Sequence, residues 1–278
     1  MSSITISLIQ ASLAWEDKAV NLHYFSEKIA ALSGKTQLVI LPEMFSTGFS
    51  MAPTRLAETM NGDTVAWMKQ QAQQHRIILT GSIIIEDGAD DSGTPRYYNR
   101  LLWVLPNGQT GHYDKRHRFA YAGEDEHYQA GNRRFIASVN GWRINLLICY
   151  DLRFPVWARQ NATDANIAGE YDLLVYVANW PERRSHAWKT LLQARAIENQ
   201  CYVAGVNRVG DDGNGIAHSG DSMVIDPLGQ VLATAGNVEN SITLTLRKEE
   251  LVDLRNKFPF WKDADSFLLV PNAGPVLR

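Results

Sequence analysis

The sequence has few cysteines, no long apolar run and little excess charge of either sign. Two cysteines among 278 residues argue against a disulfide framework, and we expect reduced thiols in a cytoplasmic compartment. No segment approaches the ~18 consecutive apolar residues of a membrane span, so no membrane partner is expected. The 27 Lys and Arg residues nearly balance the 30 Asp and Glu residues. Nucleic-acid binders need a basic face to neutralise phosphates, so this balance argues against a nucleic-acid partner.

Sequence motifs for metals and nucleotides are also absent. The chain has no Cys-x-x-Cys and no His-Glu-x-x-His, the spacings typical of zinc sites. It has no Gly-x-Gly-x-x-Gly and no P-loop. The glycine-rich segment Gly210–Gly215 lacks the lysine that grips phosphates, and it is interpreted as a flexible loop. We therefore expect neither a metal nor an organic cofactor.

The composition is that of an ordinary globular protein, with 45% apolar and 21% charged residues. No linker rich in Gly, Ser or Pro interrupts the chain, which predicts a single domain over residues 1–278. Helices are expected at 21–32, 64–74, from 185 onward and at 248–257. Strands are expected at 4–8, 38–41, 77–85, 97–105, 135–139, 142–148, 173–178, 202–206, 222–225, 231–235 and 241–246. This alternation predicts an α/β protein with buried sheets covered by helices, and its hairpins imply mixed strand pairing.

Three polar side chains follow short apolar strands: Glu43, Cys149 and Asn179. In open α/β sheets, chemistry is found beyond the carboxyl ends of the strands. Cys149 leaves its strand on a tight turn, an arrangement typical of a nucleophile elbow, although an inert buried thiol is the alternative. Cys201 adjoins an apolar run and is interpreted as a core residue.

A thiol nucleophile needs a base, and histidine is the usual one. None of the seven histidines stands in an arrangement that resembles a papain-type site. The carboxylate of Glu43 is the alternative base, unless it only caps the strand end. Lys115 taken alone indicates no more than an exposed, charged loop.

Taken together, these segments resemble the nitrilase superfamily of carbon–nitrogen hydrolases. The resemblance covers nearly the whole chain in the expected order. It rests on Leu-Pro-Glu43, Tyr-Asp-Lys115-Arg-His, Cys149-Tyr-Asp-Leu-Arg-Phe-Pro, Asn179-Trp-Pro, the segment 188–200, Gly220-Asp-Ser and Asp226-Pro-Leu-Gly. It implies a four-layer αββα sandwich of two mixed sheets with helices on the outer faces, assembled as a homodimer.

The resemblance also implies the roles of individual residues. Glu43, Lys115 and Cys149 would form the catalytic triad, with Lys115 favouring the thiolate by its opposite charge. A second glutamate is either Glu124 or Glu126, and Glu124, nine residues after Lys115, fits the family spacing better. No metal would be needed.

Further roles concern the oxyanion and the substrate. The oxyanion hole would consist of the Lys115 ammonium and the backbone N–H of Tyr150. Phe45, Trp180 and Tyr150 are candidates for shaping the pocket, with ordinary packing as the alternative. Arg153 is a candidate for substrate binding, with a structural ion pair as the alternative.

Within the superfamily, the Cys149-Tyr-Asp-Leu-Arg-Phe-Pro segment is similar to the omega-amidase (2-oxoglutaramate amidase) branch. One departure is Val156, where many relatives have glutamate. The implied reaction is hydrolysis of the terminal amide of a small 2-oxo dicarboxylic acid monoamide, such as 2-oxoglutaramate or 2-oxosuccinamate, through a cysteine thioester. The alternatives are another carbon–nitrogen hydrolase, such as an N-carbamoyl-amine or aliphatic amidase, and a catalytically silent interaction protein.

Overall fold

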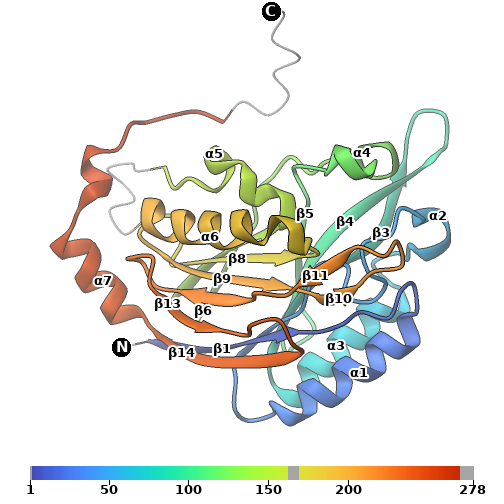
Figure 1. Ribbon diagram of the computed structural model, residues 1–278, viewed down its shortest axis with the longest axis horizontal. Coiled ribbons are helices and arrows are strands. Elements are labelled where there is room, and N and C mark those ends of the chain that lie inside the picture. The colour runs from blue at the N-terminus through green and yellow to red at the C-terminus, as the bar shows by residue number, and fades with distance from the viewer. Residues whose placement is uncertain (1, 162–168, 270–278) are drawn as a thin grey trace, which may run out of the picture.

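Two six-stranded sheets pack face to face in the computed structural model, which describes residues 2–161 and 169–269 (Figure 1). The first sheet has the order β14 (Asn240–Arg247), β1 (Ser3–Gln10), β2 (Leu38–Ile40), β3 (Ile78–Ala89), β4 (Pro95–Val104), β5 (Thr110–Asp114). The second has the order β13 (Val231–Thr234), β12 (Met223–Ile225), β9 (Tyr202–Asn207), β8 (Leu173–Ala178), β7 (Trp142–Ile148), β6 (Ile136–Val139).

Both sheets are mixed, as the sequence predicts. In the first, β1, β2 and β3 are parallel, while β14, β4 and β5 pair antiparallel. In the second, β7, β8 and β9 are parallel, while β6, β12 and β13 pair antiparallel. Each sheet therefore has a parallel centre, and the carboxyl ends of its central strands share one edge.

Helices cover the outer faces. The helical segments are α1 (Lys18–Ala31), α2 (Pro53–Leu56), α3 (Asp63–His75), α4 (Glu124–His127), α5 (Pro155–Ala158), α6 (Ser185–Asn199) and α7 (Lys248–Lys257), with short 3-10 helices η1 (Ala120–Ala122), η2 (Cys149–Arg153), η3 (Glu182–Arg184) and η4 (Phe260–Asp263). No helix in the described ranges is both long and apolar enough to cross a bilayer.

Three apolar layers explain the sandwich. Side chains of β1, such as Ile6, pack with side chains of β7, such as Leu146, between the sheets. On the outer face of the first sheet, α1 and α3 bury Phe25 and Met68. On the opposite side of the molecule, α6 buries Trp188 against the second sheet (Figure 1). The predicted four-layer αββα sandwich is confirmed.

Two segments between the predicted elements have more regular structure than expected. The glycine-rich segment is the turn of a hairpin, β10 (Val209–Asp211) with β11 (Ala217–Ser219). The Asp212 side chain orders this turn, because its Oδ1 accepts hydrogen bonds from the N–H groups of Asn214 and Ile216 at 2.8 and 2.9 Å. The charged loop after residue 112 contains the end of β5 as well as η1 and α4.

Candidate active site

The predicted strand-end residues meet in one place. Glu43 follows β2 of the first sheet, whereas Cys149 and Asn179 follow the adjacent parallel strands β7 and β8 of the second. The backbone N–H of Asn179 donates to Glu43 Oε2 at 2.8 Å. The Asn179 side chain donates to the Glu43 carbonyl at 2.5 Å, and Cys149 Sγ lies 4.0 Å from the Asn179 carbonyl oxygen. The packed sheets therefore bring a thiol and a carboxylate together.

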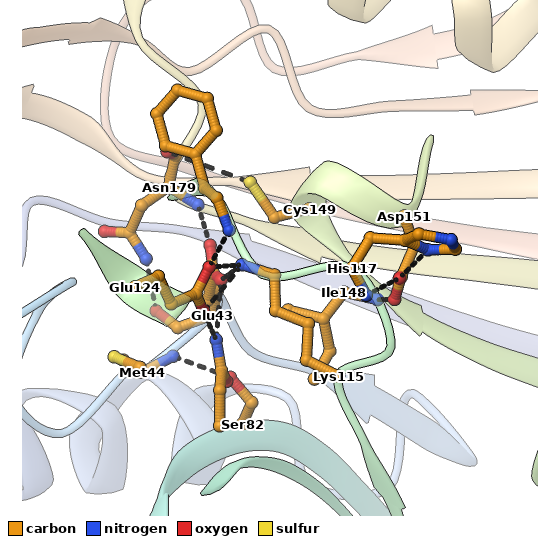
Figure 2. A network of polar contacts seen from close by, with 12 residues as sticks. Glu43, Met44, Ser82, Lys115, His117, Glu124, Ile148, Cys149, Asp151 and Asn179 are labelled. Atoms are coloured by element: carbon orange, nitrogen blue, oxygen red, sulfur yellow. Dashed lines mark hydrogen bonds and ion pairs between the residues drawn. The ribbon is translucent and has the colours of Figure 1, made fainter. Parts of the chain in front are cut away.

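Lys115 joins this group from the end of β5 (Figure 2). Its Nζ lies 2.8 Å from Glu43 Oε1 and 2.8 Å from Glu124 Oε2. The side chains of Glu43 and Glu124 are fully buried, and that of Lys115 is 1% exposed. Asn99 on β4 donates to both carboxylates, at 2.8 and 3.2 Å. One buried ammonium thus bridges two buried carboxylates.

The structure separates the two candidate glutamates. Glu124 is the first residue of α4, and its carboxylate also accepts the N–H of Phe119 at 2.5 Å. Glu126, two residues later, is exposed to solvent. Successive positions of a helical turn point about 100° apart, which places Glu124 against Lys115 and Glu126 away from it.

The charges shift the pKa values of the buried group. Burial would lower the pKa of Lys115, but the charges of Glu124 and Glu43 raise it above its usual value. Burial raises the pKa of Glu124, with Lys115 opposing and Glu43 adding to the shift. The ammonium therefore stays charged, while Glu124 favours keeping a proton more than an exposed carboxylate does.

The pKa of the Cys149 thiol is subject to opposing influences. Burial and the neighbouring Glu43 raise the pKa of the Cys149 thiol well above its usual value, and Lys115 opposes this shift without overcoming it. Lys115 thus favours the thiolate, as the family resemblance implies, whereas burial and Glu43 favour the thiol.

The backbone around Cys149 has the geometry of a nucleophile elbow. The φ angle of Cys149 is 45°, in the left-handed region that non-glycine residues rarely adopt. Cys149 directly follows β7 and begins η2. The N–H of Tyr150 lies in the first turn of η2, where backbone donors have no partner within the helix. The oxyanion hole of this N–H and Lys115 Nζ stays a prediction.

Asp151 is a residue that the sequence analysis missed as part of the site. It is fully buried, and its Oδ2 accepts hydrogen bonds from the Ile148 N–H at 3.0 Å and the Tyr113 hydroxyl at 2.8 Å. Its Oδ1 accepts the His117 N–H at 2.9 Å and lies 2.8 Å from His117 Nδ1 (Figure 2). Asp151 thus ties the elbow that carries Cys149 to the segment that carries Lys115. The signal in the sequence is its position two residues after Cys149.

A cavity of about 200 Å³ opens onto Cys149. Tyr150, Arg153 and Trp180 line it, as the sequence analysis expects of Arg153 and Trp180. Arg153 forms no ion pair in the described part of the chain, and its guanidinium lies 4.9 Å from the centre of the Trp180 ring. The structural ion pair that was the alternative for Arg153 is therefore wrong.

The expectation for Phe45 is also wrong. Phe45 is fully buried under the first sheet, where its ring packs edge-on to Phe25 and beside Trp67, away from the cavity. Its backbone N–H donates to the Ser82 carbonyl at 3.1 Å, which turns the side chain into the core. Phe49, four residues later, lines the cavity instead.

The described residues contain no group of three or more His, Cys, Asp and Glu side chains arranged to hold a metal ion. The chemistry at hand is that of a thiol, a carboxylate and an ammonium that are buried together. This set can attack a carbonyl carbon, move a proton and stabilise an oxyanion.

Comparison with known proteins identifies the family. A family model described as carbon–nitrogen hydrolase matches residues 5–256. The chain belongs to the carbon–nitrogen hydrolase family. This family membership confirms the resemblance to the nitrilase superfamily and makes the protein a hydrolase of carbon–nitrogen bonds.

Relatives match this carbon–nitrogen hydrolase over most of their length. The omega-amidase YafV of Escherichia coli is 46% identical over 272 residues, covering 97% of this chain and 100% of the relative. A 2-oxoglutaramate amidase of Bacillus subtilis is 32% identical, covering 93% of this chain and 96% of the relative. The crystal structure of a Xanthomonas campestris family member with an arsenic adduct in its active site superposes with a TM-score of 0.91 at 45% identity, covering 97% of this chain and 100% of that one.

Asp151 offers a test of how the carbon–nitrogen hydrolase site is held. In Asp151→Asn, an NH₂ group replaces one of the two oxygens that accept hydrogen bonds. This NH₂ group faces other donors, so the elbow and the Lys115 segment should shift apart. We expect kcat to fall about 10- to 100-fold with little change in KM, and the free energy of unfolding to fall by about 1–3 kcal/mol. Asp253→Asn, an exposed change on α7, is the matched control. A kcat unchanged in Asp151→Asn contradicts the positioning role.

The pair Glu124 and Glu126 provides a second test. Glu124→Gln removes a buried charge that holds Lys115, and we expect kcat to fall by about 10²-fold or more. Glu126→Gln changes an exposed side chain on the same helical turn, so kcat should remain within about twofold of the original. Measuring kcat of both variants on the same amide by steady-state kinetics decides which of the two glutamates belongs to the site. Equal effects on kcat would contradict the assignment of Glu124.

Proposed function

We propose that this protein hydrolyses the terminal amide of small 2-oxo dicarboxylic acid monoamides, such as 2-oxoglutaramate and 2-oxosuccinamate, and releases ammonia. The observation that carries the proposal is the convergence of Glu43 and Lys115 with Cys149, which lines a cavity whose wall carries arginine side chains. The names of the relatives, omega-amidase and 2-oxoglutaramate amidase, support the substrate class.

In the proposed acylation step, Cys149 Sγ attacks the amide carbon and its proton moves to Glu43. The oxyanion lies against Lys115 Nζ and the backbone N–H of Tyr150, which are fixed before charge develops. As the tetrahedral intermediate collapses, the carbon–nitrogen bond breaks and Glu43 returns the proton to the leaving nitrogen. Ammonia departs and a thioester remains on Cys149.

In the proposed deacylation step, water replaces ammonia. Glu43 takes a proton from the water as its oxygen attacks the thioester carbon. The carbon–sulfur bond then breaks, the sulfur regains the proton, and the dicarboxylic acid leaves. Glu124 acts throughout by holding Lys115, since its two oxygens lie 3.0 and 2.8 Å from Nζ.

A coupled ammonia assay tests the proposed function. We expect 2-oxoglutaramate and 2-oxosuccinamate to be hydrolysed with kcat/KM at least about tenfold above that of aliphatic amides and N-carbamoyl amines. Mass spectrometry of protein quenched during turnover should show an acyl adduct on Cys149, whose mass identifies the acyl group. If neither oxo acid monoamide is hydrolysed, the proposal is rejected. If only an N-carbamoyl amine or an aliphatic amide is hydrolysed, the protein is an N-carbamoyl-amine or aliphatic amidase instead.

The catalytically silent alternative predicts different thiol chemistry. Cys149 is 9% exposed and lines the cavity, whereas Cys201 is fully buried in the core, where a reagent cannot reach it. Low doses of iodoacetamide should therefore label Cys149 and spare Cys201. Slow, equal labelling of both cysteines would favour the silent protein.

The homodimer implied by the family resemblance stays a prediction. Light scattering of the purified protein tests it, with about twice the 31.2 kDa of one chain as the expected mass.

A further inference from the structure

The wall of the catalytic cavity carries three arginines. Arg153, Arg183 and Arg184 line the same space as Cys149. Each guanidinium lies over an aromatic ring: Arg153 is 4.9 Å from the Trp180 ring centre, Arg184 is 5.0 Å from that of Phe119, and Arg183 is 5.9 Å from that of Tyr121. Stacking on a ring orients a guanidinium but leaves its charge and its N–H donors available.

No carboxylate in the described part of the chain neutralises these arginines, and none of them donates a side-chain hydrogen bond there. Asp212 also lines the cavity, but its Oδ1 is occupied by two backbone N–H groups. Glu43 and Glu124 are engaged by Lys115. The cavity wall therefore carries three arginines and the single carboxylate of Asp212, and none of these arginines forms an ion pair within the described residues.

Arg184 is the member of this group that is held most firmly. It is half-buried, whereas Arg153 and Arg183 are exposed. Its N–H donates to the Pro181 carbonyl at 2.9 Å, and its carbonyl accepts the Trp180 indole N–H at 2.8 Å. The same segment begins at Asn179, which hydrogen bonds Glu43. The backbone of Arg184 is thus fixed relative to the catalytic group.

The electrostatics of Arg184 agree with an anion site. Burial lowers the pKa of Arg184, and the positive charges of Arg183 and Arg153 lower it further. Arg183 and Arg153 therefore lie close enough to Arg184 to repel it. A bound carboxylate would relieve this repulsion and accept a bidentate pair of hydrogen bonds from a guanidinium.

We propose that Arg184, assisted by Arg153 and Arg183, binds the carboxylate of the substrate that is remote from the scissile amide, and so determines the preference for amides of dicarboxylic acids over neutral amides. The proposal rests on the proposed function and deepens it, because it names the side chain that binds the carboxylate of the substrate. With the amide carbon at Cys149, the other end of a short chain lies within the same cavity of about 200 Å³.

Kinetics on matched substrates test the proposal. The measured quantity is the ratio of kcat/KM for 2-oxoglutaramate to kcat/KM for pentanamide, a neutral amide of equal carbon number. We expect Arg184→Met to lower this ratio about 10- to 100-fold, mainly through KM for the anionic substrate. Arg184→Lys should recover part of the loss, because it keeps the charge but not the planar fork.

The matched control is Arg247→Met, which removes one positive charge from an exposed ion pair on β14, where the Arg247 side chain is 72% exposed. It should leave the ratio unchanged. An unchanged ratio in Arg184→Met overturns the proposal. So does an equal loss on both substrates, which is the signature of a purely structural role.

A binding measurement separates this proposal from the proposed function. Titration calorimetry measures the binding of 2-oxoglutarate to the Cys149→Ala variant without turnover. In the double variant Cys149→Ala with Arg184→Met, we expect this binding to be about 10- to 100-fold weaker. If the unaltered enzyme fails to hydrolyse 2-oxoglutaramate but this loss of binding is seen, the proposed function fails and the carboxylate site stands. If hydrolysis is seen but the substitution weakens neither binding nor the kinetic ratio, the function stands and the role of Arg184 fails.

Discussion

Replacing Cys149 with alanine is expected to reduce amide hydrolysis by at least about 10⁴-fold, because it removes the proposed nucleophile. No thioester can form, so mass spectrometry of quenched reactions should show no acyl adduct. The fold should remain, since alanine deletes one sulfur atom beside a cavity. The free energy of unfolding, measured by denaturant titration, should change by about 1 kcal/mol or less.

The second cysteine supplies the control. Cys201 is fully buried in the core between the sheets and α6, and it does not line the catalytic cavity. Cys201→Ala should lower the free energy of unfolding by about 1–2 kcal/mol and leave kcat within about twofold. Steady turnover by Cys149→Ala, or loss of turnover in Cys201→Ala alone, would refute the assignment of the nucleophile.

Replacing Lys115 with methionine should affect both activity and stability. The variant leaves Glu43 and Glu124, both fully buried, without the cation that lies 2.8 Å from each. Breaking a buried ion pair in this way typically costs about 3–5 kcal/mol of stability. We also expect kcat to fall about 10³-fold, because one of the two oxyanion donors is lost.

The pH dependence of Lys115→Met has a definite sign. Burial already raises the pKa of Glu124, and Lys115 is the main group that opposes the shift. Without Lys115, Glu124 keeps its proton in the folded variant at pH values at which the unfolded chain has released it, that is, above a pKa of about 4.3. The stability of the variant relative to the unaltered protein should therefore fall as the pH rises from 5 to 8.

A double variant provides the control for Lys115. Lys115→Met with Glu124→Gln removes one of the stranded charges, so it should recover part of the lost stability and weaken the pH dependence. Hydrolysis should not return, because the oxyanion donor is still missing. Urea unfolding at pH 5 and pH 8 measures both effects. A single variant as stable as the original protein at pH 8 would show that the carboxylates do not depend on Lys115.

Local patterns were enough for the elements and for the strand-end positions of the site. Apolar alternation and helical spacing depend on a few neighbouring residues, so β8 and α7 have the predicted bounds. The same patterns place Glu43, Cys149 and Asn179 after strands. The order of the motifs along the chain then identified the family.

Other features depend on which side a residue faces, and short-range pattern does not determine this. Phe45 and Phe49 both follow the same strand, yet only Phe49 lines the cavity. Glu124 and Glu126 are equally acidic, and the turn of α4 buries one and exposes the other. In both pairs, packing against the sheets decides which side chain faces the site and which faces away from it.

By itself, then, the sequence determined the α/β architecture, the family and the identity of the three groups that converge in the cavity. Only the tertiary structure decided that burial and Glu43 raise the pKa of the Cys149 thiol, that Asp151 ties two segments together, and that Arg184 forms no ion pair within the described residues. The physical reason is that pKa values, burial and ion pairing depend on all charges nearby in space. Residues as distant in the chain as Glu43 and Asn179, 136 positions apart, become neighbours only when the two sheets pack together.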